Sequence, residues 1–288
     1  DLNKALIQES LWESVREAEL DPVRYIEFVL ARLPTEQNEI IAASMLARLR
    51  AAYLRYLSDT RRNALTARIE EFLFKELSAS SNPSRRIEYF RAYADLARSE
   101  AARARLKNLI SGQLQIPGLT LRSRDRYRML QSLLAANDTD APRLQNELAA
   151  ADASGEGRRY AFGVSAAVPD AEIKLALYTR FIDDPRLAES WIEEALGPLN
   201  MLEHASLTAP LLGPALAALP RIKRQRKIFF VNQWLGGFIG GQSSRASLQV
   251  VERFLVENKL DADLRLKVLE ALDTLEKTVR VREKFGAK

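Results

Sequence analysis

The chain has 288 residues, of which 47% are hydrophobic, 28% charged and 8% aromatic, with 12 Gly and 11 Pro. These proportions exclude a disordered or fibrous protein and are typical of a folded chain with a large core. Lys and Arg exceed Asp and Glu by 43 to 38, which gives a net charge of +5. Because both signs are interspersed along most segments, this excess does not imply a nucleic-acid partner.

Several kinds of chemistry are excluded by residue counts. The chain has no cysteine, which excludes disulfides, thiolate metal sites and cysteine nucleophiles. His204 is the single histidine, so a site built from several imidazoles is excluded too. We interpret His204 as a helix-end or surface residue without a functional role. No uncharged stretch is long enough to span a membrane. The sequence does not fix the compartment, and a soluble, cytoplasmic protein is the working expectation.

Apolar residues recur at helical spacing along nearly the whole chain, and no stretch shows a sustained period of two. Asp or Asn followed by Pro predicts a helix start, because proline lacks an N–H that the first helical turn does not use. Gly197 is expected to end a helix. The expected N-caps, in chain order, are Asp21, Thr35, Asp59, Asn82, Asp140 and Asp184. The expected loops are 112–120, 153–157 and 236–244.

Two apolar stripes each require a neighbouring helix to cover them. The spacing of caps and stripes predicts an all-α fold, an irregular superhelical array of about fifteen helices in HEAT/ARM-like antiparallel pairs. We expect residues 1–288 to form a single domain. The two stripes are Val23, Ile26, Leu30 and Leu33 near the start, and Leu264, Val268, Leu272, Leu275 and Val279 near the end.

Two basic segments are candidate binding sites. The densest basic run spans Arg221 to Lys227 and is interpreted as a solvated helix face, with a site for an anionic partner as the alternative. Arg158, Arg159 and Tyr160 combine guanidinium donors with an aromatic ring, which suits a surface that binds peptide substrates. The alternative is an arginine pair that lies along a buried tyrosine.

Residues 11–20, which read LWESVREAEL, resemble the opening of the C-terminal helical domain of zinc aminopeptidases of the aminopeptidase N type. Endoplasmic reticulum aminopeptidases share this domain. Residues 25–36, ending LPTE, resemble the helix and turn that follow it. Tyr127 and Tyr178 depart from the pattern, since tryptophan is commoner at both places. The other matching positions are Gly118, Leu119, Asp125, Arg126, Glu147, Asp152, Gly155, Ala166, Ala167, Pro169 and Lys174.

The resemblance implies a bowl of HEAT-like helix pairs that covers a catalytic domain and closes a chamber around its zinc. The catalytic motifs of the family are absent, so the resemblance places zinc in the parent enzyme and no cofactor in this chain. It implies two partners, the parent's own N-terminal catalytic domain and peptide substrates. We therefore expect a piece of a longer protein, namely the non-catalytic capping and substrate-gating domain of an enzyme that removes N-terminal residues from peptides.

Two other functions stay open from the residues alone. The chain could be a free-standing helical-repeat scaffold that binds protein or nucleic acid through a basic face, and salt-sensitive oligonucleotide binding would favour this function. It could also be a helical-repeat base-excision enzyme. Such an enzyme needs an acid in an aromatic pocket, and no acid is evident beside Trp12, Trp191 or Trp234.

Overall fold

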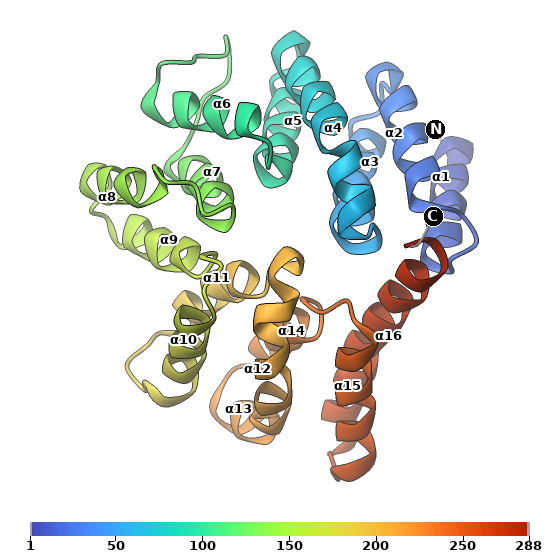
Figure 1. The fold of residues 1–288 in the computed structure, drawn as a ribbon, viewed down its shortest axis with the longest axis vertical. Coiled ribbons are helices and arrows are strands. Elements are labelled where there is room, and N and C mark those ends of the chain that lie inside the picture. The colour runs from blue at the N-terminus through green and yellow to red at the C-terminus, as the bar shows by residue number, and fades with distance from the viewer. Residues whose placement is uncertain (1, 287–288) are drawn as a thin grey trace. The chain divides into compact units, whose positions relative to one another are not determined.

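A computed structural model describes residues 2–286, and its ribbon consists of α-helices joined by turns and loops (Figure 1). The described residues contain sixteen α-helices, two short 3₁₀ turns, one π-helical segment and no strand. The predicted all-α class is therefore confirmed. The predicted number of about fifteen helices is close to the sixteen that the described residues form. Asp1, Ala287 and Lys288 lie outside the described residues.

The chain divides into two compact units. The first comprises the residues up to Leu133 together with those from Arg280 onward. Its helices are α1 (Leu2–Arg16), α2 (Pro22–Arg32), α3 (Glu39–Ala51), α4 (Asp59–Ala79), α5 (Pro83–Leu96), α6 (Glu100–Ser111) and most of α7 (Ser123–Ala135). A 3₁₀ turn (Leu33–Thr35) precedes α3, and a π-helical segment (Ala52–Tyr56) follows it.

Residues 134–279 form the second unit. Its helices are α8 (Ala141–Ala151), α9 (Gly155–Ser165), α10 (Ala171–Asp183), α11 (Glu189–Leu199), α12 (Ala205–Ala217), α13 (Leu219–Gln225), α14 (Ile228–Phe238), α15 (Arg245–Glu257) and most of α16 (Ala262–Phe285). A 3₁₀ turn (Leu202–His204) precedes α12. Inside each unit a helix packs on helices one to three places along the chain, such as α4 on α5 and α12 on α15. Such local packing agrees with the predicted stacking of helix pairs. The expectation of one domain over residues 1–288 stays a prediction.

Two predicted caps are confirmed in atomic detail. The Asp21 side chain accepts a hydrogen bond from the Val23 N–H at 2.9 Å, and Pro22 opens α2. The Asn82 side chain accepts from the Ser84 N–H at 2.9 Å before α5. Each cap satisfies a backbone donor that has no partner within its helix.

Three further caps differ in detail. Thr35 ends the 3₁₀ turn instead of starting a helix, because Asn38 caps α3 with its own side chain. Asp59 is the first residue of α4, so Ser58 takes the N-cap position. Asp140 does occupy the N-cap position of α8, although its side chain makes no capping bond.

Asp184 and Gly197 were predicted wrongly. Asp184 follows the last residue of α10, and its carboxylate accepts from the Arg186 N–H at 3.0 Å, which folds Pro185 into a turn. The next helix begins only at Glu189. Gly197 lies inside α11, which continues for two residues because Leu199 is fully buried in the core.

The loop predictions are confirmed at 112–120 and only partly elsewhere. Gly112 ends α6 with φ of 79°, a left-handed conformation that favours glycine. Helix α9 starts inside the expected loop at 153–157, and α14 extends past Gly236 to Phe238. Buried neighbours on α14, among them Trp234 and Phe238, hold this helix together across its glycines.

The core of the second unit surrounds Trp234 on α14 and includes the predicted stripe on α16, all of which is buried. Lys174 on α10 is 0% exposed, although lysine is among the residues least often buried. Its ammonium donates to the Ala166 carbonyl at 3.1 Å and the Leu199 carbonyl at 2.7 Å. These carbonyls lie at the C-terminal ends of α9 and α11, so Lys174 on α10 links three helices. Its positive charge interacts favourably with the negative ends of the α9 and α11 dipoles.

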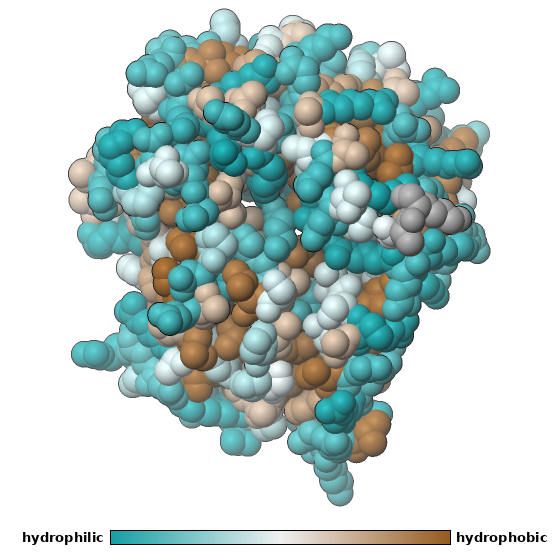
Figure 2. Space-filling model, viewed as in Figure 1, coloured by the Kyte–Doolittle hydropathy of each residue, from teal (hydrophilic) through white to brown (hydrophobic). Residues whose placement is uncertain are grey.

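The face drawn in Figure 2 is largely hydrophilic over the helices of the first unit. Apolar residues show between hydrophilic ones over α10 and α12 of the second unit. No helix within residues 2–286 combines the length and the apolar character that a membrane crossing requires.

Candidate functional site

The predicted substrate-binding residues lie on α9, which begins where the Ser154 side chain accepts from the Gly157 N–H at 3.0 Å. Helix α9 packs closely on α11 at Gly163. A Cβ atom at Gly163 would lie 2.6 Å from the Glu194 Cγ and 3.1 Å from its carbonyl oxygen. Glycine at this position therefore sets the spacing of the two helices that carry the site.

The structure brings Arg159 and Tyr160 together and separates Arg158 from them. The Arg159 guanidinium lies 3.4 Å from the Glu194 carboxylate and 5.2 Å from the centre of the Tyr160 ring. Tyr160 is 9% exposed, so mainly the arginine faces water. Arg158 is exposed and donates back to the Ala153 carbonyl in the preceding turn. Peptide binding by these three residues stays a prediction.

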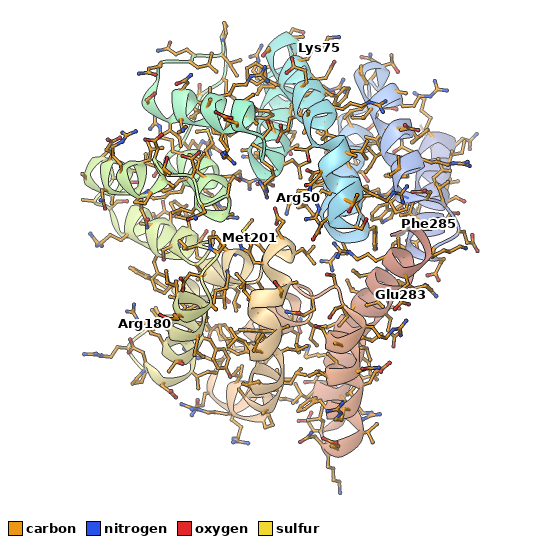
Figure 3. The ribbon with its side chains drawn as sticks, viewed as in Figure 1. Arg50, Lys75, Arg180, Met201, Glu283 and Phe285 are labelled. Atoms are coloured by element: carbon orange, nitrogen blue, oxygen red, sulfur yellow. The ribbon has the colours of Figure 1, made fainter. Side chains whose placement is uncertain are left out.

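A cavity that the sequence did not reveal lies between the end of α10 and the start of α11. Its volume is about 470 Å³, and it is lined by Arg180, Asp184, Arg186, Leu187, Ala188 and Trp191. Arg180 lies on α10 (Figure 3), and its guanidinium is 5.3 Å from the centre of the Phe162 ring. The centre of the Phe162 ring lies 5.3 Å from that of the Trp191 ring. Phe162 is one helical turn beyond Arg159 on α9, and its ring contacts Arg180 and Trp191, two residues that line the cavity.

The cavity carries more positive than negative charge. Asp184 lies 3.4 Å from the Arg180 guanidinium and 3.7 Å from that of Arg186. The hydrogen bond from the Arg186 backbone N–H, followed by these arginines, lowers the pKa of Asp184 and keeps it ionised. One carboxylate between two guanidinium groups leaves N–H donors for an added carboxylate beside the Trp191 ring.

One part of this cavity, the turn at Asp184-Pro185, had a signal in the sequence that was interpreted otherwise. Asp184-Pro185 suggested a helix start, which would have placed Arg186 in the first turn of a helix. The observed turn instead brings Arg186 and Arg180 to the same carboxylate.

Two of the five basic residues at 221–227, Arg221 and Lys223, form ion pairs with neighbouring carboxylates. The Lys223 ammonium lies 2.6 Å from Asp261 and 2.9 Å from Asp263. The Arg221 guanidinium lies 3.6 Å from Asp183. These pairs agree with a solvated helix face and reduce the charge available to an anionic partner.

His204 lies at a helix end, as expected, but it is buried and not on the surface. Its Nε2 atom is 3.1 Å from the Ala135 carbonyl oxygen, and this polar contact accounts for a histidine inside the protein. In the part of the chain that the structure describes, no three histidine, aspartate or glutamate side chains lie together as metal ligands would.

Comparisons with known proteins extend this description. A family model described as the ERAP1-like C-terminal domain matches residues 1–277. Aminopeptidase N of Streptomyces lividans is 24% identical over 283 residues, which cover 98% of this chain and 33% of that protein. The chain thus spans a third of the length of this relative. A solved structure titled "Computational Design of Self-Assembling Cyclic Protein Homooligomers" is 14% identical, with 98% of this chain and 95% of that chain covered, at a TM-score of 0.21.

Proposed function

Since the chain belongs to the family of ERAP1-like C-terminal domains, we propose that it is the capping and substrate-gating part of a zinc aminopeptidase. The parent enzyme removes N-terminal residues from peptides, and its zinc and catalytic groups lie outside this chain. The observation that carries the proposal is the family match over residues 1–277. A relative named Aminopeptidase N, a third of which this chain covers, supports it.

The cavity on α10 and α11 supports a role in holding substrate. A volume of about 470 Å³ admits a side chain or the end of a peptide, and Arg180 and Arg186 offer donors to a carboxylate there. Arg159 lies on α9, one helical turn before Phe162, whose ring contacts the cavity lining. A packed helical array contributes binding surface without a catalytic group of its own. In this proposal the chain selects peptides, and the preceding part of the enzyme cleaves them.

The first test asks which part of the parent enzyme holds zinc and cleaves peptides. The gene is expected to continue upstream of the codon for Asp1 through a reading frame with an HExxH motif. Purified parent enzyme should hold zinc and release N-terminal residues from peptides, whereas the untagged chain of residues 1–288 should do neither. Metal analysis and a peptide-hydrolysis assay measure both properties. Stoichiometric zinc in the isolated chain, or a start codon directly before Asp1, would contradict the proposal.

The second test concerns the predicted binding residues. Arg159→Glu in the parent enzyme is expected to raise KM for peptides about 10-fold with kcat unchanged, because a charge-assisted hydrogen bond to substrate is lost. Arg158→Glu is expected to act in the same direction. Steady-state kinetics over a series of peptide lengths measures the effect.

The matched control is Arg143→Glu on α8, an exposed arginine that also pairs with carboxylates. It should leave KM unchanged. If KM for peptides of every length is the same in all three variants, Arg158 and Arg159 do not contact substrate.

A further inference from the structure

Three arginine side chains of the first unit meet where α4 begins and α16 ends. Arg62 lies in the first turn of α4 and is 7% exposed. Arg55 belongs to the π-helical segment and Arg282 to the last turn of α16, and both are half-buried. We refer to these three residues as the arginine cluster. Arginine is rarely buried unless it is paired, so three buried or half-buried arginines together require an explanation.

The backbone between α3 and α4 brings the cluster together. Arg62 donates to the Leu54 and Leu57 carbonyls, each at 3.4 Å. The Arg282 Nε atom donates to the Arg55 carbonyl at 2.8 Å, one residue beyond the Leu54 carbonyl. Two guanidinium groups from different helices therefore lie at adjacent carbonyls of one π-helical segment. Such segments are rare and often occur at functional sites.

Two further hydrogen bonds fix the end of α16 beside the start of α4. The Ser58 hydroxyl donates to the Gly286 carbonyl at 3.1 Å. The Arg61 guanidinium donates to the Phe285 carbonyl at 2.9 Å. Figure 3 marks Phe285 at this end of α16. Backbone carbonyls thus hold the α16 member of the cluster beside its α4 member, independently of the cluster's own side chains.

Burial makes the positive charges of the cluster costly. Burial, followed by the charge of Arg62, lowers the pKa of Arg282 to about 10, and burial lowers the pKa of Arg55 as well. Asp59 lies 3.3 Å from the Arg62 guanidinium, but its side chain is 84% exposed, so water screens this pair. The buried Nε atom of Arg62 has no hydrogen-bond partner among the described residues. A bound anion would stabilise the charged guanidinium groups and raise these pKa values again.

We propose that the arginine cluster binds a small oxyanion of the phosphate class, which serves as a counter-ion between the π-helical segment, α4 and the end of α16. The donors come from three different elements, which suits a tetrahedral ion whose oxygens point in several directions. A planar carboxylate is matched instead by the fork of a single arginine. Arg55 and Arg282 are partly exposed, so an ion in solution can reach them. The inference does not rest on the proposed function, because every residue in it belongs to this chain.

The experiment titrates inorganic phosphate into the whole untagged chain by isothermal titration calorimetry, at neutral pH and at an ionic strength held constant with sodium chloride. Wild type is expected to bind one phosphate ion, and its thermal unfolding midpoint should rise with phosphate because the ion binds the folded state. Arg282→Gln is expected to raise the Kd for phosphate about 10-fold, since a charge-assisted hydrogen bond is lost. The matched control is Arg280→Gln, at an exposed arginine of the same helix that pairs with Glu17. It should leave Kd unchanged.

Asp59→Asn tests the inference through a gain of binding. It removes a negative charge beside Arg62 and is expected to lower the Kd for phosphate about 5-fold. If the arginines only hold backbone carbonyls, phosphate binding has no reason to tighten. Circular dichroism checks that each variant is folded, and Asp59→Asn keeps the test decisive if Arg282→Gln does not fold.

Three results would overturn the inference: no saturable heat of binding beyond that of sodium chloride, an equal Kd in wild type and folded Arg282→Gln, or binding that does not tighten in Asp59→Asn. Acetate at the same ionic strength tests the class of ligand. Acetate that binds as tightly as phosphate would mean a carboxylate site and would overturn the phosphate assignment. None of these results depends on zinc or on peptide cleavage, so the proposed function is tested separately.

Discussion

The free energy of unfolding is expected to rise by about 3 kcal/mol between pH 8 and pH 10.5 through Lys174, and Lys174→Met is expected to abolish that rise. Burial lowers the pKa of Lys174 from 10.5 to about 8. The two hydrogen-bond partners of its ammonium are neutral backbone carbonyls. The positive charge therefore lacks a compensating negative charge at hydrogen-bond distance, which makes the charged form costly.

The sign follows from proton binding in the two states. In the unfolded chain, lysine keeps its proton up to about pH 10.5, whereas in the folded chain it loses the proton near pH 8. Between these values the unfolded state binds more protons, so stability rises with pH. Below pH 8 both states are protonated, and the full cost of burying the charge remains.

Urea unfolding of wild type and Lys174→Met at pH 7, 8, 9 and 10 measures this contribution as the difference between the two proteins. Burial raises the pKa of Tyr25, Tyr89 and Tyr93 to about 12, so all three destabilise both folded proteins alike at high pH. Their effect cancels in the difference. Lys75→Met, at an exposed lysine on α4, serves as control and should follow wild type. Parallel pH profiles for wild type and Lys174→Met would show that burial does not perturb this lysine.

Trp234→Ala is expected to lower the free energy of unfolding by roughly 4 kcal/mol, the range for truncation of a large buried aromatic residue. Trp234 is 1% exposed, and its Nε1 atom donates to the Ala215 carbonyl at 3.0 Å. Its ring centre lies 4.5 Å from that of Phe238 and 6.0 Å from that of Phe230. Alanine would leave a cavity among these rings and a buried carbonyl without its donor.

Phe229→Ala provides a matched control, because Phe229 lies on the same helix but is 74% exposed. It should change the free energy of unfolding by no more than about 0.5 kcal/mol. Urea unfolding followed by circular dichroism measures both variants. Equal losses in the two variants would mean that helix propensity, and not core packing at Trp234, sets the cost.

Local patterns in the sequence were sufficient to predict the fold class. The stripe from Leu264 to Val279 is buried along its whole length, because helical spacing of apolar residues depends only on the residues themselves. Asp21 and Asn82 cap their helices for the same reason. Asp184 does not cap a helix, because an Asp-Pro pair also suits a turn. Tertiary packing decides between a helix start and a turn.

The candidate site was predictable only in part. Adjacent residues such as Arg159 and Tyr160 remain neighbours in any helix, so their proximity followed from the sequence. The cavity required Arg180 and Trp191 from different helices, and no local pattern specifies how those helices pack. Lys174 entered only through the family resemblance. Its burial was not foreseen, because composition alone favours a lysine on the surface.

The close approach at Gly163 affects how variants of this protein should be interpreted. Any larger residue there would push Glu194 aside and release the guanidinium that it holds one turn earlier on α9. A screen for loss of the peptide binding proposed for Arg159 would then report Gly163 and Arg159 together, although glycine has no side chain that could bind a ligand. Loss of function at the glycine would then measure how closely α9 and α11 must pack, and it would not identify Gly163 as a binding residue.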